Sequence, residues 1–263
     1  MLSCFCFSGG VNSTALALEI ARGEHIRPDC AVNLPTDADD ATTRAGVQLA
    51  ADYLRAAGVP CYQLARANIL GTEINNILAA KAGRISYRPL CPFWYRDARG
   101  RTLALRRQCT RFHKTRPLRA MLRRLAGISD AAGHVRAPIA EFWLGFTTDE
   151  PLRCRQPRPR WLAHRFPLVR HEYSRADCRA ILDAEGEYEV IRSACIICPY
   201  RRDPDWLAMR AHNPEAYATA CDFDAQLRDA SPRLGKLYLH RSCRPLPEAL
   251  ADVRDDDPNH RGT

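Results

Sequence analysis

The sequence lacks the features that mark membrane proteins and low-complexity chains. Its longest apolar stretches are far shorter than the roughly 20 helical residues needed to cross a bilayer. No fixed-period repeat or run of like residues occurs, and 14 glycines and 18 prolines are ordinary counts for 263 residues, which argues against collagen-like, solenoid and disordered proteins. We therefore expect a soluble protein, without a membrane segment, that folds around a buried core.

A secretory signal pattern is also missing. Residues 1–7 are apolar, but they carry no basic leader and are followed by no cleavage site. Twelve cysteines would suggest disulfides in a small secreted domain, whereas a chain of this size folds without them. We expect a cytoplasmic protein in which clustered cysteines serve metal or redox chemistry and the others are small buried side chains.

Lysine is scarce, and arginine gathers in two segments. Residues 96–124 carry ten Arg and one Lys against one Asp, and residues 153–170 carry six Arg and no acid. The net charge of the chain is only +9, so the remainder is acidic. This distribution predicts a localised positive surface suited to the phosphates of a nucleotide or a nucleic acid. The alternative is an arginine-rich composition on a solvated face. Trp161 is a candidate for stacking on a base or for anchoring its loop.

Short apolar segments alternate with helical patterns along the chain. Strand patterns occur at 2–7, 30–34, 61–64 and 139–146, and helical patterns occur at 13–21, 42–57, 69–80, 117–125, 175–186 and in two pieces after 203. This alternation predicts an α/β fold with a doubly wound parallel sheet covered by helices on both faces. Segments 83–114 and 151–167, rich in proline and arginine, are predicted loops. We predict a nucleotide-binding domain over 1–170 and a helical, cysteine-bearing region over 171–263.

A turn rich in serine and glycine lies between the first strand and the first helix. Residues 8–13 read Ser-Gly-Gly-Val-Asn-Ser. Backbone N–H groups and the helix dipole jointly hold an anion at such a position, and serine hydroxyls offer further contacts to phosphate oxygens. The turn lacks the Lys-Ser/Thr ending of a Walker loop and the spacing of a dinucleotide fingerprint. It therefore predicts a phosphate-binding turn of another kind.

This turn resembles the Ser-Gly-Gly-x-Asp-Ser pyrophosphate loop of the ATP pyrophosphatase superfamily, which includes sulfate-assimilation reductases, tRNA thiolation enzymes and amide-forming synthetases. Asn12 stands where that superfamily usually has an aspartate, and an amide cannot neutralise Mg²⁺. The resemblance implies an adenine nucleotide alpha hydrolase-like fold, with adenine beside the main chain after the second strand. The ATP-binding residues that it implies are Ser8, Gly9, Gly10, Val11, Asn12, Ser13, Asn33 and Leu34.

Two cysteines, Cys195 and Cys198, are separated by two residues and followed by a proline. This spacing lets both sulfurs face one metal ion, but it does not choose between zinc, an iron–sulfur cluster and a dithiol. A third thiol is available at Cys109, within Arg-Gln-Cys-Thr, although spacing alone does not show that it meets the other two.

The resemblance joins these thiols into one site. Reductase-like members of the superfamily carry both an Arg-Gln-Cys-Thr segment and a Ser-x-Cys-x-x-Cys-Pro-Tyr/Phe-Arg segment, as this chain does. Segments 145–150 and 166–168 are also similar, so the resemblance covers most of residues 1–210. It implies that Cys109, Cys195 and Cys198 bind a [4Fe–4S] cluster with one open iron. Cys91 is the candidate fourth ligand, which would close the cluster and argue against sulfide delivery. Zn²⁺ held by four thiolates, or an unligated buried pair, are the alternatives.

Other polar residues are candidates for catalysis. Asp149 and Glu150 end a strand at the edge where doubly wound sheets bind ligands, so either is a candidate for orienting Mg²⁺ or for capping a turn. His113 and Lys114 are candidates for phosphate contact or proton donation, or they form a solvated pair. As the catalytic set we take Asn12, Asp149 and Lys114.

The resemblance implies an enzyme that uses ATP and Mg²⁺ to adenylylate a substrate carbonyl, which sulfur then attacks. The expected acceptor is a nucleobase, a nucleotide or a nucleic acid, the expected sulfur donor is sulfide or a desulfurase, and a homodimer is possible. An adenylyl-sulfate reductase is a second hypothesis, although Cys221 and Cys243 lack the Glu-Cys-Gly context of those relatives. The third is a non-catalytic nucleic-acid-binding protein with a degenerate loop.

Overall fold

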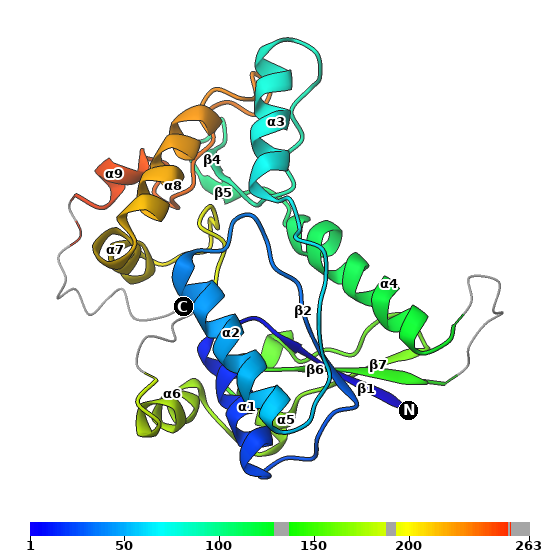
Figure 1. Ribbon diagram of the computed structural model, residues 1–263. Helices are drawn as coiled ribbons and strands as arrows, with labels where there is room; N and C mark the ends of the chain where they lie inside the picture. Colours follow the sequence, from blue (N-terminus) through cyan, green and yellow to red (C-terminus); the bar gives the residue numbers. More distant parts are fainter. Residues whose placement is uncertain (129–136, 188–192, 252, 254–263) are drawn as a thin grey trace. The chain divides into compact units, whose positions relative to one another are not determined.

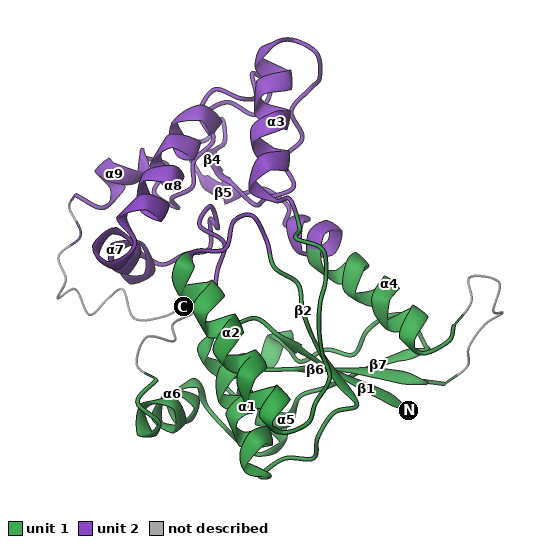
Figure 2. Cartoon of the chain, in the orientation of Figure 1, with its two compact units in different colours: residues 1–35, 41–67, 114–193 green, residues 36–40, 68–113, 194–263 purple. Residues whose placement is uncertain are grey.

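The computed structural model describes residues 1–128, 137–187, 193–251 and 253. The chain divides into two compact units, coloured separately in Figure 2. Unit 1 comprises residues 1–35, 41–67 and 114–193, and unit 2 comprises residues 36–40, 68–113 and 194–263. This division differs from the boundary predicted at residue 170, because two segments from the first half of the chain belong to unit 2.

Unit 1 contains a five-stranded parallel sheet flanked by helices (Figure 1). The strands follow the order β3-β2-β1-β6-β7, and every neighbouring pair is parallel. Their bounds are β1 (Leu2–Phe7), β2 (Cys30–Asn33), β3 (Cys61–Gln63), β6 (Ala140–Leu144) and β7 (Leu162–Arg165). The predicted α/β class is confirmed, and the central position of β1 is compatible with a doubly wound sheet.

Alternate side chains of β1 enter two hydrophobic cores, as a period of two residues requires. Phe5 and Phe7 lie in the core formed with one group of helices, whereas Cys4 lies in the core that includes Leu122. The first group is α1 (Val11–Arg22), α2 (Ala41–Ala56), α5 (Pro167–Arg170) and α6 (Arg175–Ala184). Leu122 belongs to α4 (Arg116–Leu125). Helices therefore pack against both faces of the sheet.

The two segments predicted as loops contain regular structure, so those predictions are wrong in part. Strand β7 lies within 151–167 and pairs with β6, after the short 3₁₀ turn Pro151–Arg153. Within 83–114, β4 (Trp94–Arg96) and β5 (Thr102–Ala104) form an antiparallel hairpin, and a π-helix covers Thr110–Thr115. These short strands lie within stretches rich in proline and arginine, so no apolar run marks them in the sequence.

Unit 2 packs helices and the β4–β5 hairpin around buried aromatic side chains. Its helices are α3 (Leu70–Lys81), α7 (Asp203–His212), α8 (Pro214–Leu227) and α9 (Leu246–Ala249), and Phe93, Trp206 and Phe223 are almost fully buried. The Asp37 carboxylate accepts backbone N–H bonds from residues 69, 70 and 71 at 2.6, 2.9 and 2.7 Å. These bonds satisfy N–H groups that the first turn of α3 leaves open. None of the helices described is long and apolar enough to cross a membrane.

A close backbone approach fixes the turn that follows β1. Gly9 has a φ of 68°, and a Cβ built on it would lie 2.3 Å from the backbone nitrogen of Val47. A Cβ on Gly46, inside α2, would lie 2.2 Å from the carbonyl oxygen of Gly9. Both positions therefore need glycine, because the turn rests directly on the backbone of α2.

Gly46→Ala should destabilise unit 1, although glycine-to-alanine changes in exposed helices stabilise by about 1 kcal/mol. The added methyl group would displace the Gly9 carbonyl, so we expect the free energy of unfolding in urea to fall by about 2 kcal/mol. Gly71→Ala in α3 is the matched control, because its Cβ would meet only the movable side chain of Asn68. Equal effects of the two changes on stability would contradict this packing.

Candidate functional site

The turns that follow β1 and β6 meet at the carboxyl edge of the parallel sheet. A Cβ on Gly145, directly after β6, would lie 3.3 Å from the Cα of Ser13. The order of strands reverses between β1 and β6, and α/β sheets bind ligands outside such a switch point. The predicted phosphate turn therefore occupies the position of the sheet that most favours a ligand.

The phosphate turn, residues 8–13, is held in shape by the Ser13 hydroxyl. This group donates to the carbonyl of Gly10 at 3.0 Å and accepts the N–H of Ser8 at 3.2 Å. Helix α1 begins at Val11, so the N–H groups of its first turn have no acceptor within the helix. The sequence thus places open donors and the positive end of a twelve-residue helix at one turn.

Ser193 lies over part of this turn. Its hydroxyl is 2.9 Å from that of Ser8, and a Cβ on Gly10 would lie 2.9 Å from its backbone nitrogen. Ser8 is exposed, whereas residues 9–13 are buried. Ser193 therefore packs against the Cα of Gly10 and bonds to the Ser8 hydroxyl, the exposed group of the turn.

Two buried amides at the site have unsatisfied oxygens. Asn12 donates from Nδ2 to the Glu150 carboxylate at 3.4 Å, and Asn33 donates from Nδ2 to the Phe7 carbonyl at 3.0 Å. Among the residues with described positions, neither Oδ1 atom has a hydrogen-bond partner. A buried acceptor without a partner costs about 1–3 kcal/mol, so both atoms are suited to a donor or cation supplied by a ligand.

Two of the predicted catalytic residues, Asp149 and Lys114, form no hydrogen bond with the phosphate turn in the described part of the chain. Asp149 accepts the backbone N–H of Arg175 at the start of α6, so its carboxylate caps that helix. Lys114 lies in the π-helix before α4, and in the described part of the chain it forms no hydrogen bond with the phosphate turn. The Asn33 carbonyl, at the end of β2 and before Leu34, accepts the N–H of residue 64 at 3.0 Å. Of the carboxylates considered, Glu150 is the one bound to Asn12.

The four predicted metal-ligating cysteines all belong to unit 2. Two of them are positioned by backbone bonds around Leu90. The Leu90 carbonyl accepts the N–H of Cys109 at 2.8 Å, and the buried Glu73 carboxylate accepts the N–H groups of Leu90 and Cys91 at 2.9 and 3.0 Å. Helix α3, which carries Glu73, therefore holds both cysteines in place.

The Cys91 and Cys109 thiols share a hydrogen bond. This bond, with the positive charge of Arg107, lowers the pKa of Cys109 to about 6. The same bond and burial raise the pKa of Cys91, which also interacts electrostatically with Cys195. Three of the predicted ligands therefore lie within interaction range, and Cys109 is the one that favours the thiolate form that binds metals.

The second pair of cysteines lies in a tight turn. The N–H of Cys198 donates to the Cys195 carbonyl at 3.0 Å, and the buried Arg201 side chain donates to the same carbonyl at 3.1 Å. Within the described residues, no group of three or more His, Cys, Asp or Glu side chains is arranged to hold a metal ion. The chemistry of the donors nevertheless fits a soft metal, because four thiols in one unit include an acidic thiol beside an arginine.

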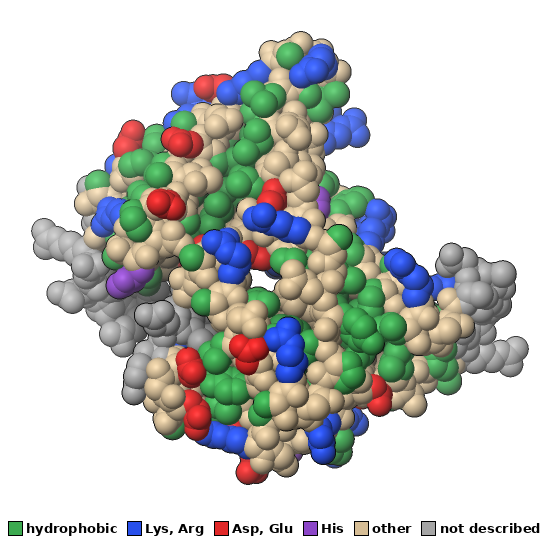
Figure 3. All heavy atoms as spheres, in the orientation of Figure 1, with side chains coloured by type: hydrophobic (Ala, Val, Ile, Leu, Met, Phe, Trp, Pro, Cys, Tyr) green, Lys and Arg blue, Asp and Glu red, His purple; other side chains and the backbone are tan. Residues whose placement is uncertain are grey.

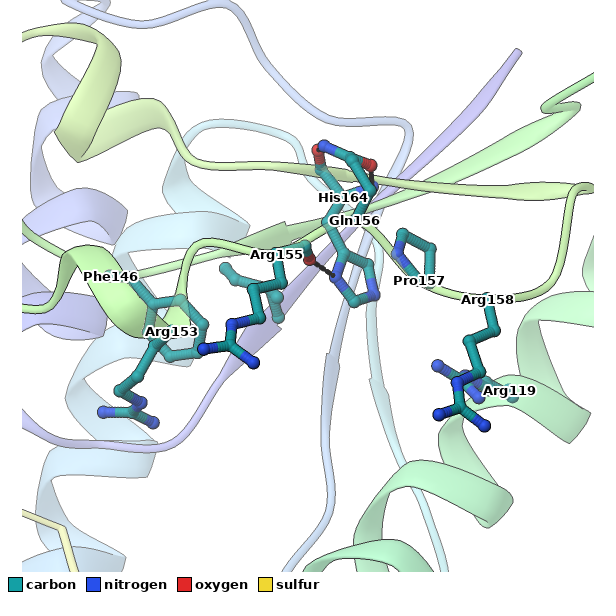
Figure 4. A pocket seen from close by; sticks show the side chains of 9 residues that line it. Arg119, Phe146, Arg153, Arg155, Gln156, Pro157, Arg158 and His164 are labelled. Atoms are coloured by element: carbon teal, nitrogen blue, oxygen red, sulfur yellow. Dashed lines mark hydrogen bonds between the residues drawn. The ribbon is translucent and has the colours of Figure 1, made fainter.

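Sequence reasoning missed a pocket of about 440 Å³ in unit 1, shown in Figure 4. Four arginines and His164 contribute to its wall, but no acidic residue does. The acid-free segment 153–170 indicated part of this pocket in the sequence. The sequence did not indicate that Arg119 from α4 also lines it. Trp161 lies outside this wall, buried with Arg123 over its ring at 5.8 Å, and so anchors the loop.

Comparisons of the chain with protein-family models, with curated proteins and with solved structures found no match.

Protein purified without oxygen should contain iron and acid-labile sulfide, at about four irons per chain for a [4Fe–4S] cluster. Cys109→Ser and Cys195→Ser should each remove most of the iron, because each deletes one thiolate ligand. Cys221→Ser, in α8 of the same unit, is the matched control and should keep it. Elemental analysis that finds one zinc and no iron would refute the cluster.

Proposed function

We propose that this protein is an ATP-dependent adenylylating enzyme of the pyrophosphate-loop type. The observation that carries the proposal is the position of the phosphate turn, between the central strand β1 and helix α1, at the switch point of a parallel sheet. The resemblance of residues 8–13 to the pyrophosphate loop supports the same assignment, and with it the adenine nucleotide alpha hydrolase-like version of the fold.

In this function the chain binds the β- and γ-phosphates of ATP at the phosphate turn. Amides at the start of α1 and the hydroxyl of Ser8 donate to the phosphate oxygens, while the Ser13 hydroxyl keeps its bond to Gly10 and holds the turn, and the helix dipole stabilises the phosphate charge. The turn is already rigid, because Ser13 bonds to both of its sides and Gly9 rests on α2. A preformed turn stabilises developing charge without reorganisation during the reaction.

The reaction begins when a carbonyl oxygen of the substrate attacks the α-phosphorus of ATP. The bond between the α-phosphorus and its bridging oxygen breaks, pyrophosphate leaves, and AMP is joined to the substrate oxygen. A carbonyl oxygen is a poor leaving group, whereas AMP is a good one, so a sulfur nucleophile can then displace it. The chain orients the phosphates and the acceptor, which is the larger part of catalysis in phosphoryl transfer.

Glu150 provides the negative charge that Asn12 lacks. The two side chains are joined at 3.4 Å, so a carboxylate lies beside the position where the superfamily usually has aspartate. Mg²⁺ prefers carboxylate oxygens and phosphate oxygens together. Glu150 would therefore bind the Mg²⁺ that accompanies ATP, with the unpartnered Oδ1 of Asn12 as a second oxygen.

Cys109, Cys195 and Cys198 are the residues that would hold a [4Fe–4S] cluster and leave one iron open, whereas Cys91 as a fourth ligand would close the cluster or complete a Zn²⁺ site. A bound cluster with an open iron would supply sulfur chemistry for the second half-reaction. Leu90, Glu73 and Arg201 set the backbone around these cysteines, and the positive charges of Arg107 and Arg201 offset the thiolates. Sulfide or a desulfurase would provide the transferred atom.

The second candidate function is a nucleic-acid-binding protein that does not turn over ATP. The bond of Ser193 to the Ser8 hydroxyl, which occupies a group that a phosphate would contact, favours it. Pyrophosphate release that depends on an added acceptor separates the two functions, because only the enzyme produces it. An adenylyl-sulfate reductase would instead release sulfite.

Ser13→Ala should weaken ATP binding about tenfold, because it removes both internal hydrogen bonds that hold the turn in its phosphate-binding shape, each worth about 1 kcal/mol. Isothermal titration calorimetry with ATP and Mg²⁺ measures the effect.

Ser174→Ala is its control, because this serine caps α6 in the same unit. The control should lower stability by about 1 kcal/mol and leave ATP affinity unchanged. An unchanged affinity for ATP in Ser13→Ala would overturn the assignment of the phosphate turn.

A further inference from the structure

The arginine pocket of unit 1 lies at strands β6 and β7 of the sheet. None of the residues that line it belongs to the phosphate turn. Helix α4, the loop after β6 and strand β7 form its walls (Figure 4). The residues that line it are Arg119, Leu144, Phe146, Arg153, Arg155, Gln156, Pro157, Arg158 and His164. All of them belong to one compact unit.

Three guanidinium groups in this pocket have no acidic partner. Arg153 pairs with Glu150, whereas in the described part of the chain Arg119, Arg155 and Arg158 form no ion pair. Burial lowers the pKa of Arg119, because the charge loses contact with water and no anion replaces it. Arg119 and Arg158 both line this pocket. An anion bound there would replace the hydration that Arg119 has lost.

The wall that carries these arginines is fixed before any ligand binds. The Gln156 amide pairs with both backbone groups of His164, donating to the carbonyl and accepting the N–H, each at 2.9 Å. The Arg155 carbonyl lies 2.9 Å from Nδ1 of His164, the contact drawn in Figure 4. The loop therefore lies against the edge strand β7 as an extra strand would, which reduces the ordering cost of binding.

His164 adds a second kind of contact. A carbonyl only accepts, so its bond to Nδ1 places the ring proton there and leaves Nε2 as an acceptor. Burial and the charge of Arg119 lower the pKa of His164, which keeps the ring neutral. The pocket thus offers guanidinium donors for phosphate beside an acceptor for an N–H or O–H group. A nucleotide unit has a phosphate for the guanidinium groups and an N–H or O–H group on its base or sugar for Nε2 of His164. Inorganic phosphate has no base or sugar to use the His164 acceptor.

Positive charge continues beyond the pocket on the same two segments. Residues 114–125 and 153–170 contain no acidic residue, and Figure 3 shows basic side chains over α4 and acidic ones over α6 and α8. The arginines and lysine outside the pocket wall are Lys114, Arg116, Arg123, Arg124, Arg160, Arg165 and Arg170. This is more charge than one mononucleotide neutralises, and it suits consecutive phosphates of a strand.

We propose that the arginine pocket binds the phosphate backbone of a single-stranded nucleic acid, with Arg119, Arg155 and Arg158 on phosphates and His164 on a base or sugar. This proposal rests on the proposed function for the role of the strand as acceptor. A base carbonyl that receives AMP must be unpaired, and unpaired bases occur in single strands. The pocket would hold the strand while the target base reaches the nucleotide site.

The test measures binding of a fluorescently labelled oligonucleotide of roughly 12 nucleotides by anisotropy, without ATP. Single-stranded RNA and DNA are the probes, and the proteins are the full chain and two double variants. Arg119→Gln/Arg158→Gln should weaken binding at least about tenfold and reduce the slope of log affinity against log salt by about 1.4. Arg27→Gln/Arg66→Gln removes the same charge from two exposed residues of the same unit that lie outside both basic segments, and it should cost less than about threefold.

Equal losses in both double variants would overturn the proposal, since binding would then follow net charge alone. Displacement of the strand by ATP or inorganic phosphate at equal concentration would also overturn it, because the pocket would then be a mononucleotide or phosphate site. If the first variant unfolds on a thermal melt, Arg158→Gln alone replaces it, as this side chain is exposed. ATP is absent from this test, so its result does not depend on the Ser13→Ala test. If the chain binds the strand but not ATP, the proposed enzymatic function fails and the proposal of strand binding stands.

Discussion

The contact between the Gly9 turn and helix α2 is the constraint on which the candidate nucleotide site depends. Two glycines allow backbone to lie on backbone, and their close approach sets the direction in which α1 leaves the sheet. Ser13 then closes the turn with bonds to Gly10 and Ser8. The open amides of α1 therefore have a fixed direction before any ligand arrives, which is the condition for electrostatic stabilisation without reorganisation.

A second constraint is the separation of charge within unit 1. Acidic residues pair elsewhere with arginines, as Glu19 does with Arg22, whereas the pocket arginines Arg155 and Arg158 are left without such partners. Isolated surface ion pairs contribute little to stability, so their absence here costs the fold little. It leaves a field of one sign next to the sheet edge, and such a field raises the local concentration of anionic ligands.

The sequence predicted four strands of the sheet and the turn after β1 because these depend on local signals. Short apolar runs mark the strands and clear periods mark the helices, and the helix predicted from residue 175 begins at the capping box of Ser174 and Asp177. Strand β7 was missed, since it lies among prolines and arginines and its pairing with β6 is non-local. The pocket was missed for the same reason: Arg119 of α4 and Arg158 of the loop that precedes β7 are distant in the sequence but line one cavity.

Residue spacing in the sequence also could not show which polar side chains form hydrogen bonds with the phosphate turn. Asp149 and Glu150 are neighbours, but one caps α6 and the other binds Asn12. Their roles differ because adjacent side chains point to different sides of a turn. The cysteines behave similarly: Cys91 and Cys109 meet through backbone bonds around Leu90 that no spacing rule contains.

Hydrogen–deuterium exchange with and without ATP and Mg²⁺ tests the central claim most directly, because it locates the phosphates on the chain. The account predicts slower exchange of the amides at Gly9 to Ser13, with segments of unit 1 far from this turn unchanged. Slower exchange elsewhere in the chain, with that turn unaffected, would contradict it.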